Sequence, residues 1–92
     1  MLFTTGQVIQ TKGLYSLLEN NPTRHNEVVA AFNQYVTGNW GNTCPEDAAM
    51  NNEAVRTGND RIVAKYKLSF ADIFIITEID RSYTTILLCD EY

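Results

Sequence analysis

Histidine, cysteine and tryptophan are scarce in this chain of 92 residues, which has one, two and one of them respectively. A tetrahedral zinc site usually takes four ligands from cysteine and histidine, and His25, Cys44 and Cys89 cannot supply four without carboxylates. Neither cysteine and none of the serines lies in a sequence pattern typical of a catalytic nucleophile. These absences predict no metal site and no cofactor, and they leave the sequence without a recognisable catalytic apparatus.

Long apolar runs and a signal peptide are missing as well. No stretch approaches the roughly 20 apolar residues of a membrane span, and residues 1–10 lack the basic start and apolar core of a signal peptide. We therefore expect a soluble cytoplasmic protein that does not bind membranes. In that compartment the two cysteines are expected to be free thiols.

The chain also has little clustered positive charge. Eleven acidic residues against seven basic ones give a formal charge of −4, and only Arg61, Lys65 and Lys67 lie close together. Broad nucleic-acid binding needs clustered lysine and arginine, so it is not expected here. One or two arginines could still hold a small anionic ligand. An acidic surface also suits a basic protein partner.

Two helices are predicted in the first part of the chain. Apolar residues recur at helical spacing over 13–19, and a helix there would end before Pro22. A longer helix is expected over 22–37, because Asn21 is a good N-cap and Pro22 occupies the first helical position without losing a hydrogen bond. Its apolar stripe consists of Val28, Val29, Phe32, Tyr35 and Val36.

A third helix is predicted from about 44 to 56. Thr43 followed by Glu46 three residues later matches a capping box, with Thr43 as the N-cap. Its apolar side is weak, and the pair Asn51-Asn52 lowers its helix propensity. We expect this helix to lie on the surface and to stop near Gly58.

From residue 60 the apolar period changes from helical to two. Ile62, Ala64 and Tyr66 alternate with polar or half-polar positions, which predicts a half-buried strand. Two further strands are expected over 72–79 and 83–89, joined by a tight turn at 80–82.

These elements predict one α+β domain over residues 1–92. Three helices would pack on a small antiparallel three-stranded meander, with a short edge strand between Gly6 and Thr11. The last two strands are apolar on both faces, and three modest helices cover one face better than two. The pattern therefore predicts a homodimer. The expected core joins strand residues to the long helix through Ile62, Ile75, Leu87, Val28, Phe32 and Val36.

Few side chains stand out as candidates for function. Trp40, between two glycines, is either a lid on the core or an anchor for a partner. Arg81 is expected either to be free at its turn to bind a carboxylate or phosphate, with Asp80 orienting it, or to stabilise the turn together with Asp80. Glu78 and Asp80 project from the same face of a strand end, where paired carboxylates could do acid–base chemistry, bind Mg²⁺, or form a salt bridge with Arg81 in a solvated turn. His25 is expected to be an exposed surface residue. The candidate binding residues are thus Trp40, Asp80 and Arg81.

Three stretches resemble a known group of proteins: 38–41 (Gly-Asn-Trp-Gly), 75–82 (Ile-Ile-Thr-Glu-Ile-Asp-Arg-Ser) and 84–88 (Thr-Thr-Ile-Leu-Leu) leading to Tyr92. The group consists of small bacterial, plasmid and phage proteins, often labelled plasmid-related or mislabelled as restriction-modification subunits. The group often has acidic residues flanking the tryptophan, where this chain has asparagines, so no acidic or metal-binding role is carried over. The resemblance implies a mobile-element setting and no particular chemistry.

The leading hypothesis is a non-enzymatic binding or inhibitory protein of a phage or plasmid, one that antagonises a bacterial defence system. It would block a protein partner or sequester a small nucleotide. One alternative is a small hydrolase that uses Glu78 or Asp80 with Arg81, and another is a structural subunit of a larger assembly.

Overall fold

The C-terminal half of the chain forms three antiparallel strands in sequence order, as the alternating pattern predicts. They are β2 (Ile62–Lys67), β3 (Asp72–Thr77) and β4 (Tyr83–Leu88) in the computed structural model, which describes all 92 residues. β3 ends two residues earlier than expected because Arg81 N–H donates to the carbonyl of Glu78, at 2.9 Å, and closes the turn. The predicted meander is confirmed.

The sheet has a fourth strand and is mixed. β1 (Gln7–Gln10) is the short edge strand expected between Gly6 and Thr11, and it pairs with β4 in parallel, so the strand order is β1-β4-β3-β2. The approach to β1 requires glycine at position 6, which has φ +61°. A Cβ there would lie 2.2 Å from the carbonyl oxygen of Ser82. The first and last parts of the chain are therefore joined through a contact that no local pattern reveals.

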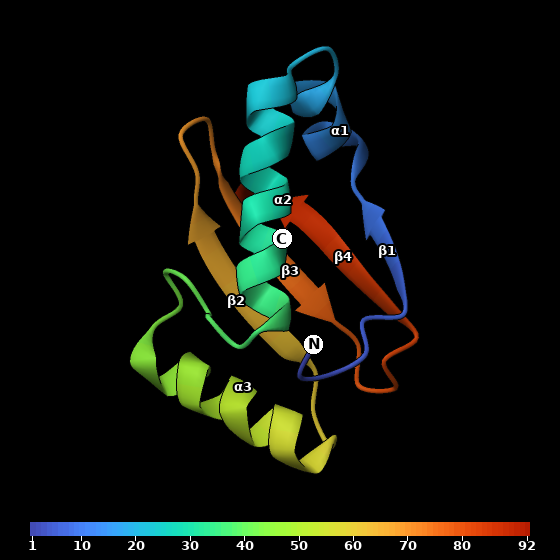
Figure 1. Ribbon diagram of the computed structural model, residues 1–92, viewed down its shortest axis with the longest axis vertical. Helices are drawn as coiled ribbons and strands as arrows, with labels where there is room; N and C mark the ends of the chain where they lie inside the picture. Colours follow the sequence, from blue (N-terminus) through green and yellow to red (C-terminus); the bar gives the residue numbers. More distant parts are fainter.

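Three helices accompany the sheet: α1 (Lys12–Leu18), α2 (Pro22–Val36) and α3 (Pro45–Thr57). Figure 1 shows α2 crossing one face of the sheet, with α1 beside the upper end of α2 and above β1, and with α3 below α2. A single turn of 3₁₀ helix, η1 (Cys89–Glu91), follows β4. None of the helices combines the length and apolar character needed to cross a lipid bilayer.

The helix ends partly match expectation. The side chain of Asn21 accepts a hydrogen bond from Arg24 N–H at 3.1 Å, as an N-cap should. The capping box at Thr43 is wrong, since α3 begins one residue later with Cys44 as its N-cap. The Thr43 hydroxyl is instead engaged with the backbone, donating to Trp40 O at 2.6 Å and accepting from Lys65 N–H at 2.9 Å.

The core lies between α2 and the face of the sheet that it crosses. Ile62, Ile75, Val28 and Val36 are buried in one cluster as predicted, with the half-buried Phe32 against it. Leu87 is a correction. Leu87 pairs with Phe74, and this pair is adjacent to the core pair Ile75 and Ile86. Successive side chains of a strand point to opposite faces of the sheet. Leu87 therefore lies on the opposite face of the sheet.

Candidate binding groove along helix α3

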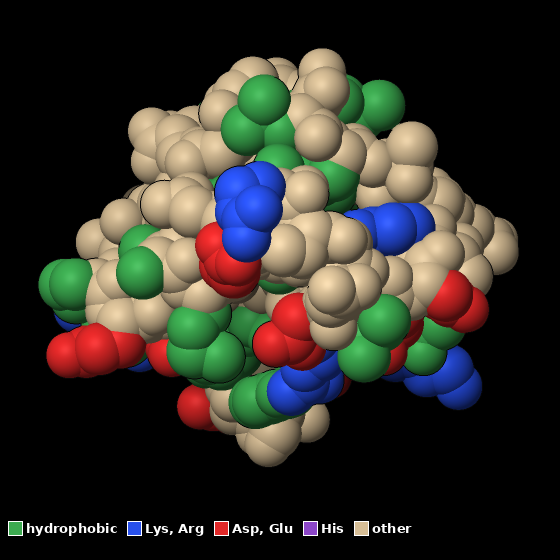
Figure 2. Space-filling model, turned by 90° about the horizontal axis from the view of Figure 1, so that it is seen from below, with side chains coloured by type: hydrophobic (Ala, Val, Ile, Leu, Met, Phe, Trp, Pro, Cys, Tyr) green, Lys and Arg blue, Asp and Glu red, His purple; other side chains and the backbone are tan.

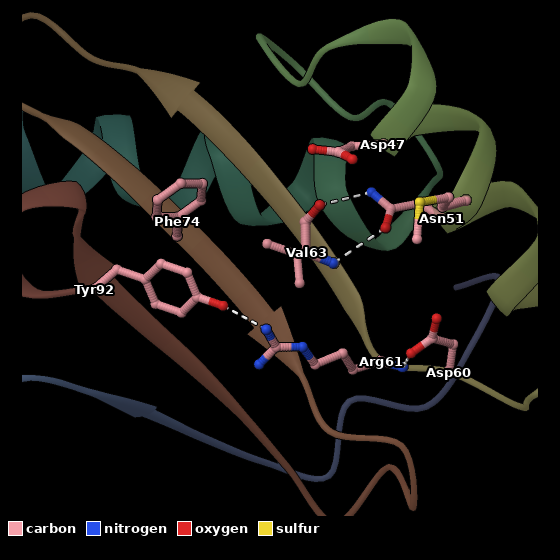
Figure 3. Close-up of a pocket in the computed structure, with 8 residues that line it drawn as sticks. Asp47, Asn51, Asp60, Arg61, Val63, Phe74 and Tyr92 are labelled. Carbon is pink, nitrogen blue, oxygen red and sulfur yellow. Dashed lines mark hydrogen bonds between the residues drawn. The ribbon is translucent and has the colours of Figure 1, made fainter.

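The face of the sheet opposite α2 carries apolar side chains, and the last residue of the chain packs on it. Phe74, Ile76 and Leu87 project from this face, and the ring of Tyr92 packs on Phe74 with 5.1 Å between ring centroids. The turn of η1 brings the chain back over β3 and positions this ring. Figure 3 shows Tyr92 pointing across the strand toward Arg61.

A cavity of about 310 Å³ opens where this face meets α3. Its walls come from α3, from the residues just before and within β2, from β3 and from the chain end (Figure 3). The residues that line it are Asp47, Met50, Asn51, Asp60, Arg61, Val63, Phe74 and Tyr92.

Arg61 and Tyr92 hold one another at the mouth of this cavity. The Arg61 guanidinium donates a hydrogen bond to the Tyr92 hydroxyl and also lies 5.8 Å from the centroid of the Tyr92 ring. The backbone N–H of Arg61 donates to the carboxylate of Asp60 at 2.8 Å. A cation over an aromatic face is attracted by the ring quadrupole, so these contacts restrain both side chains.

Asn51 lines the same cavity, and its side chain is hydrogen-bonded to the backbone of β2. Its amide donates to Val63 O at 2.8 Å and accepts from Val63 N–H at 3.1 Å, and the residue is only 4% exposed. Farther along β2, the side-chain oxygen of Asn42 accepts a hydrogen bond from Lys67 N–H at 2.9 Å. Together with Thr43, these side chains close the outer edge of β2, where unpaired peptide groups would otherwise be exposed.

Two further hollows adjoin the cavity. One shares Asp47, Val63 and Phe74 with it, and the other shares Met50 and Asp60. The three together make a groove along the exposed flank of the helix, which we call the α3 groove. Its floor is apolar. Figure 2 views the molecule from below, and acidic and basic side chains alternate with hydrophobic ones across the lower half of the picture.

The carboxylates along the α3 groove differ in their partners. Glu53 forms an ion pair with Arg56, and this contact holds the pKa of Glu53 below its ordinary value. Asp47 and Asp60 form no ion pair. The groove therefore presents two carboxylates whose charge no neighbouring cation neutralises through direct contact.

Trp40, the first residue singled out in the sequence, lies in the core with 7% of its surface exposed. Its ring packs against Phe3 and Tyr35, and its indole N–H donates to the side chain of Asn52 at 2.8 Å. Of the two roles considered for this side chain, these contacts correspond to the lid on the core.

Asp80 and Arg81 are occupied within their turn. The Asp80 carboxylate accepts from the Ser82 hydroxyl at 2.6 Å and from Ser82 N–H at 3.0 Å, and these bonds hold the pKa of Asp80 below its ordinary value. The Arg81 guanidinium, expected to be free, donates to the backbone carbonyls of four residues: Ala54, Asp60, Glu78 and Ile79. The structure thus gives Trp40, Asp80 and Arg81 separate partners and does not assemble them into one site.

Other candidate side chains are isolated. His25 is exposed in the first turn of α2, as expected. Cys44 and Cys89 are free thiols, and burial raises the pKa of Cys89. No group of three His, Cys, Asp or Glu side chains is placed to hold a metal ion.

The residues of the α3 groove were missed in the sequence. Asn51 was read only as a weak helix former, although two adjacent asparagines inside a helix are a signal that their side chains have other partners. Phe74 was read only as one position of a two-faced strand, and Tyr92 only as the end of a resembling stretch. Their convergence depends on the return of the chain after β4.

Comparisons of the chain with models of protein families, with curated proteins and with solved structures find no match.

Proposed function

We propose that this is a non-enzymatic binding protein that takes a basic, partly apolar segment of a protein partner into the α3 groove. One observation carries the proposal: an apolar floor, formed by Val63 and Phe74, lies beside the unpaired carboxylates of Asp47 and Asp60. Burial of apolar side chains supplies affinity, and the carboxylates favour a lysine or arginine over an acidic residue.

The rigidity of the groove supports this proposal. Asn51 fixes α3 to β2 through both peptide groups of Val63, and Arg61 fixes the ring of Tyr92. A groove whose walls are already ordered loses little conformational entropy when a ligand binds. The net charge of −4 adds a long-range attraction for a basic partner.

Sequestration of a small nucleotide is the second form of the binding hypothesis. Arg61 lines the central cavity and Lys65 lines one adjoining hollow, and the guanidinium of Arg61 is already bound to Tyr92. Phosphate oxygens bound there would lie near the carboxylates of Asp47 and Asp60, which repel them. The groove therefore favours a basic peptide over a nucleotide.

The contacts at residues 78–82 give no support to the hydrolase alternative. That alternative needs Arg81 to act on a substrate together with Glu78 or Asp80, and the Arg81 guanidinium donates to four backbone carbonyls within the fold. The setting of a mobile element, in which binding would block a host protein, rests on the resemblance of the three stretches around Trp40, Ile75–Ser82 and Thr84–Leu88.

The experiment compares peptides with nucleotides. Fluorescence anisotropy would measure binding of a labelled library of short peptides that mix Lys or Arg with Leu or Phe, and of labelled ATP and GTP. We expect selected basic–apolar peptides to bind and Asp47→Asn to weaken them about tenfold or more, the loss of one charge-assisted contact. Glu46→Gln is the matched control, because Glu46 is exposed in the same helical turn and does not line the groove.

Two results would overturn the proposal. One is nucleotide binding that Arg61→Ala removes and Asp47→Asn leaves unchanged, which would assign the cavity to an anion. The other is peptide binding that Asp47→Asn and Glu46→Gln weaken equally, which would show a general charge effect and no role for the groove.

A further inference from the structure

The two edges of the sheet are treated differently by the chain. At the β2 edge, the side chains of Asn42, Thr43 and Asn51 bind the outward peptide groups of the strand. At the β1 edge no element lies outside the strand, which forms the right-hand border of the sheet in Figure 1. Only one edge is therefore closed.

The peptide groups of β1 alternate between β4 and solvent. Gln7 N–H donates to Ser82 O at 3.1 Å and Thr11 N–H donates to Ile86 O at 3.2 Å, so the odd-numbered residues face β4. The N–H and C=O of Val8 and Gln10 consequently point away from the sheet. All four residues of β1 are exposed.

Nothing on β1 opposes pairing with another strand. Proteins commonly protect an edge with lysine, proline, a bulge or a covering loop. The sequence of β1 is Gln-Val-Ile-Gln, without charge or proline, and Val8 and Ile9 are 45% and 41% exposed. This edge is open both in its hydrogen-bonding groups and in its side chains.

We propose that β1 pairs antiparallel with β1 of a second copy of this chain, about a two-fold axis at Ile9. In this register Val8 lies opposite Gln10 of the second copy, and the outward N–H and C=O groups of both residues exchange hydrogen bonds. The two Ile9 side chains meet at the axis on the face opposite α2, where side chains of a non-hydrogen-bonded pair lie closest. The two sheets become one.

A second copy fits this edge better than an unrelated strand. The two-fold axis pairs Val8 of each copy with Gln10 of the other, so the outward N–H and C=O groups of both residues are satisfied without a further sequence requirement. The α3 groove lies beside β2, the opposite border of the sheet, and stays accessible in each copy. This inference goes beyond the proposed binding function and does not depend on it.

A dimer formed through the apolar face of the sheet, as the sequence pattern suggests, would bury little additional surface. Ile76 and Leu87, on the face opposite α2, are only 5% and 7% exposed in the single chain, so little of their surface remains to be buried. Pairing at β1 uses backbone groups in place of a large apolar area. A strand of four residues makes a small interface, and such interfaces are typically weak and concentration-dependent.

The test is a concentration series by analytical ultracentrifugation from low micromolar to millimolar chain. We expect the mass to rise from 10.4 kDa toward twice that value. Added salt should favour the dimer, because each copy carries −4 and screening reduces the repulsion between copies. Amide hydrogen exchange, measured residue by residue, should slow at Val8 and Gln10 as the dimer forms, while Ile9 is protected at every concentration.

Gln10→Pro and Gln10→Ala form a matched pair. Both remove the glutamine side chain, but only proline removes the outward N–H, and proline is tolerated at an edge whose N–H faces solvent. The dissociation constant should rise at least tenfold in Gln10→Pro and change less than threefold in Gln10→Ala. If Gln10→Pro proves to be misfolded by circular dichroism, the amide-exchange pattern of the unaltered chain decides.

Three outcomes would overturn the inference. The first is a mass of one chain up to millimolar concentration. The second is a dimer that Gln10→Pro does not weaken, which would assign association to another surface. The third is exchange at Val8 and Gln10 that does not slow as the concentration rises.

Discussion

The hydroxyl of Tyr35 lies 2.7 Å from the hydroxyl of Thr77, and both residues are fully buried. Thr77 lies a further 2.7 Å from Thr84, which donates to the carbonyl of Thr5 at 2.7 Å. Because a hydroxyl has one hydrogen, the donation by Thr84 sets the direction of the chain. Thr77 therefore donates to Thr84, and Tyr35 shares its one hydrogen between the Thr77 hydroxyl and the carbonyl of Ile62, 3.1 Å away. Through Thr84 and Thr5 the N-terminal segment is bound to the core.

Thr84→Val is expected to destabilise the fold more than Thr77→Val. Without the Thr77 hydroxyl, Tyr35 can donate fully to Ile62 O, already 3.1 Å away, and Thr84 keeps its bond to Thr5. Without the Thr84 hydroxyl, the buried carbonyl of Thr5 has no donor. Urea unfolding should give losses of about 1–3 kcal/mol for Thr84→Val and about 0.5–1.5 kcal/mol for Thr77→Val. Equal losses would contradict the direction of the chain.

The stability of the fold should fall at alkaline pH. Burial raises the pKa of both Tyr35 and Tyr66 above the ordinary value of 10. A group whose pKa is raised in the folded protein contributes its full stabilisation below the pKa that it has in the unfolded chain. This contribution is lost as the pH rises from that value toward the pKa of the folded state. The free energy of unfolding, measured in urea between about pH 8 and about pH 11, should therefore decline above about pH 10.

The variant Tyr66→Phe separates this effect from general alkaline damage. It removes one of the two buried hydroxyls, together with its 2.7 Å hydrogen bond to Asn39 O. The variant should be less stable at neutral pH, yet lose less stability on going from about pH 8 to about pH 11. An unchanged slope would mean that Tyr66 does not contribute to the pH dependence.

The elements that follow local rules could be predicted from the sequence. Asn21 and Pro22 start α2 as expected, and the alternation of Ile62, Ala64 and Tyr66 places β2 correctly, because caps and strand periods depend on near neighbours. The parallel pairing of β1 could not be predicted, since it joins Gln7 to Tyr83 across most of the chain. The same reason applies to the α3 groove, whose walls come from four separate segments.

Asn51→Ala should destabilise the fold much more than Asn52→Ala. The first change leaves both peptide groups of Val63 without their partner, at a cost of about 1–3 kcal/mol. The second removes the acceptor for Trp40 N–H, but Asn52 itself is exposed and water can replace it. Thermal unfolding compares the two, and both substitutions gain the same helix propensity from alanine.

The edge of β2 gives a second measurement for Asn51→Ala. Loss of the side chain exposes an unpaired N–H and C=O on the strand, and such edges recruit other chains. Amide exchange at Val63 should become faster, and light scattering at raised protein concentration should increase. Fast exchange in the unaltered protein would show that Asn51 does not close this edge.

Arg81 is expected to stabilise the fold, although most residues in exposed turns contribute little to stability. Its guanidinium donates to Ala54 O at 3.1 Å in the last turns of α3, to Asp60 O at 2.7 Å and to two carbonyls of its own turn. A cation near the C-terminal end of a helix also interacts favourably with the helix dipole. Arg81→Ala is therefore expected to cost about 1–3 kcal/mol in urea unfolding, where an ordinary exposed position would change by less than about 0.5 kcal/mol.

The backbone of Arg81 provides the control for this prediction. Its φ is +60°, a left-handed conformation that glycine adopts more easily than alanine. Arg81→Gly loses the same guanidinium contacts but relieves the backbone, so it should be about 1 kcal/mol less destabilising than Arg81→Ala. Arg56→Ala, which breaks only a surface ion pair with Glu53, should change stability by less than about 0.5 kcal/mol. If Arg81→Ala matches Arg56→Ala, the guanidinium contributes nothing to the fold and becomes a candidate for ligand binding again.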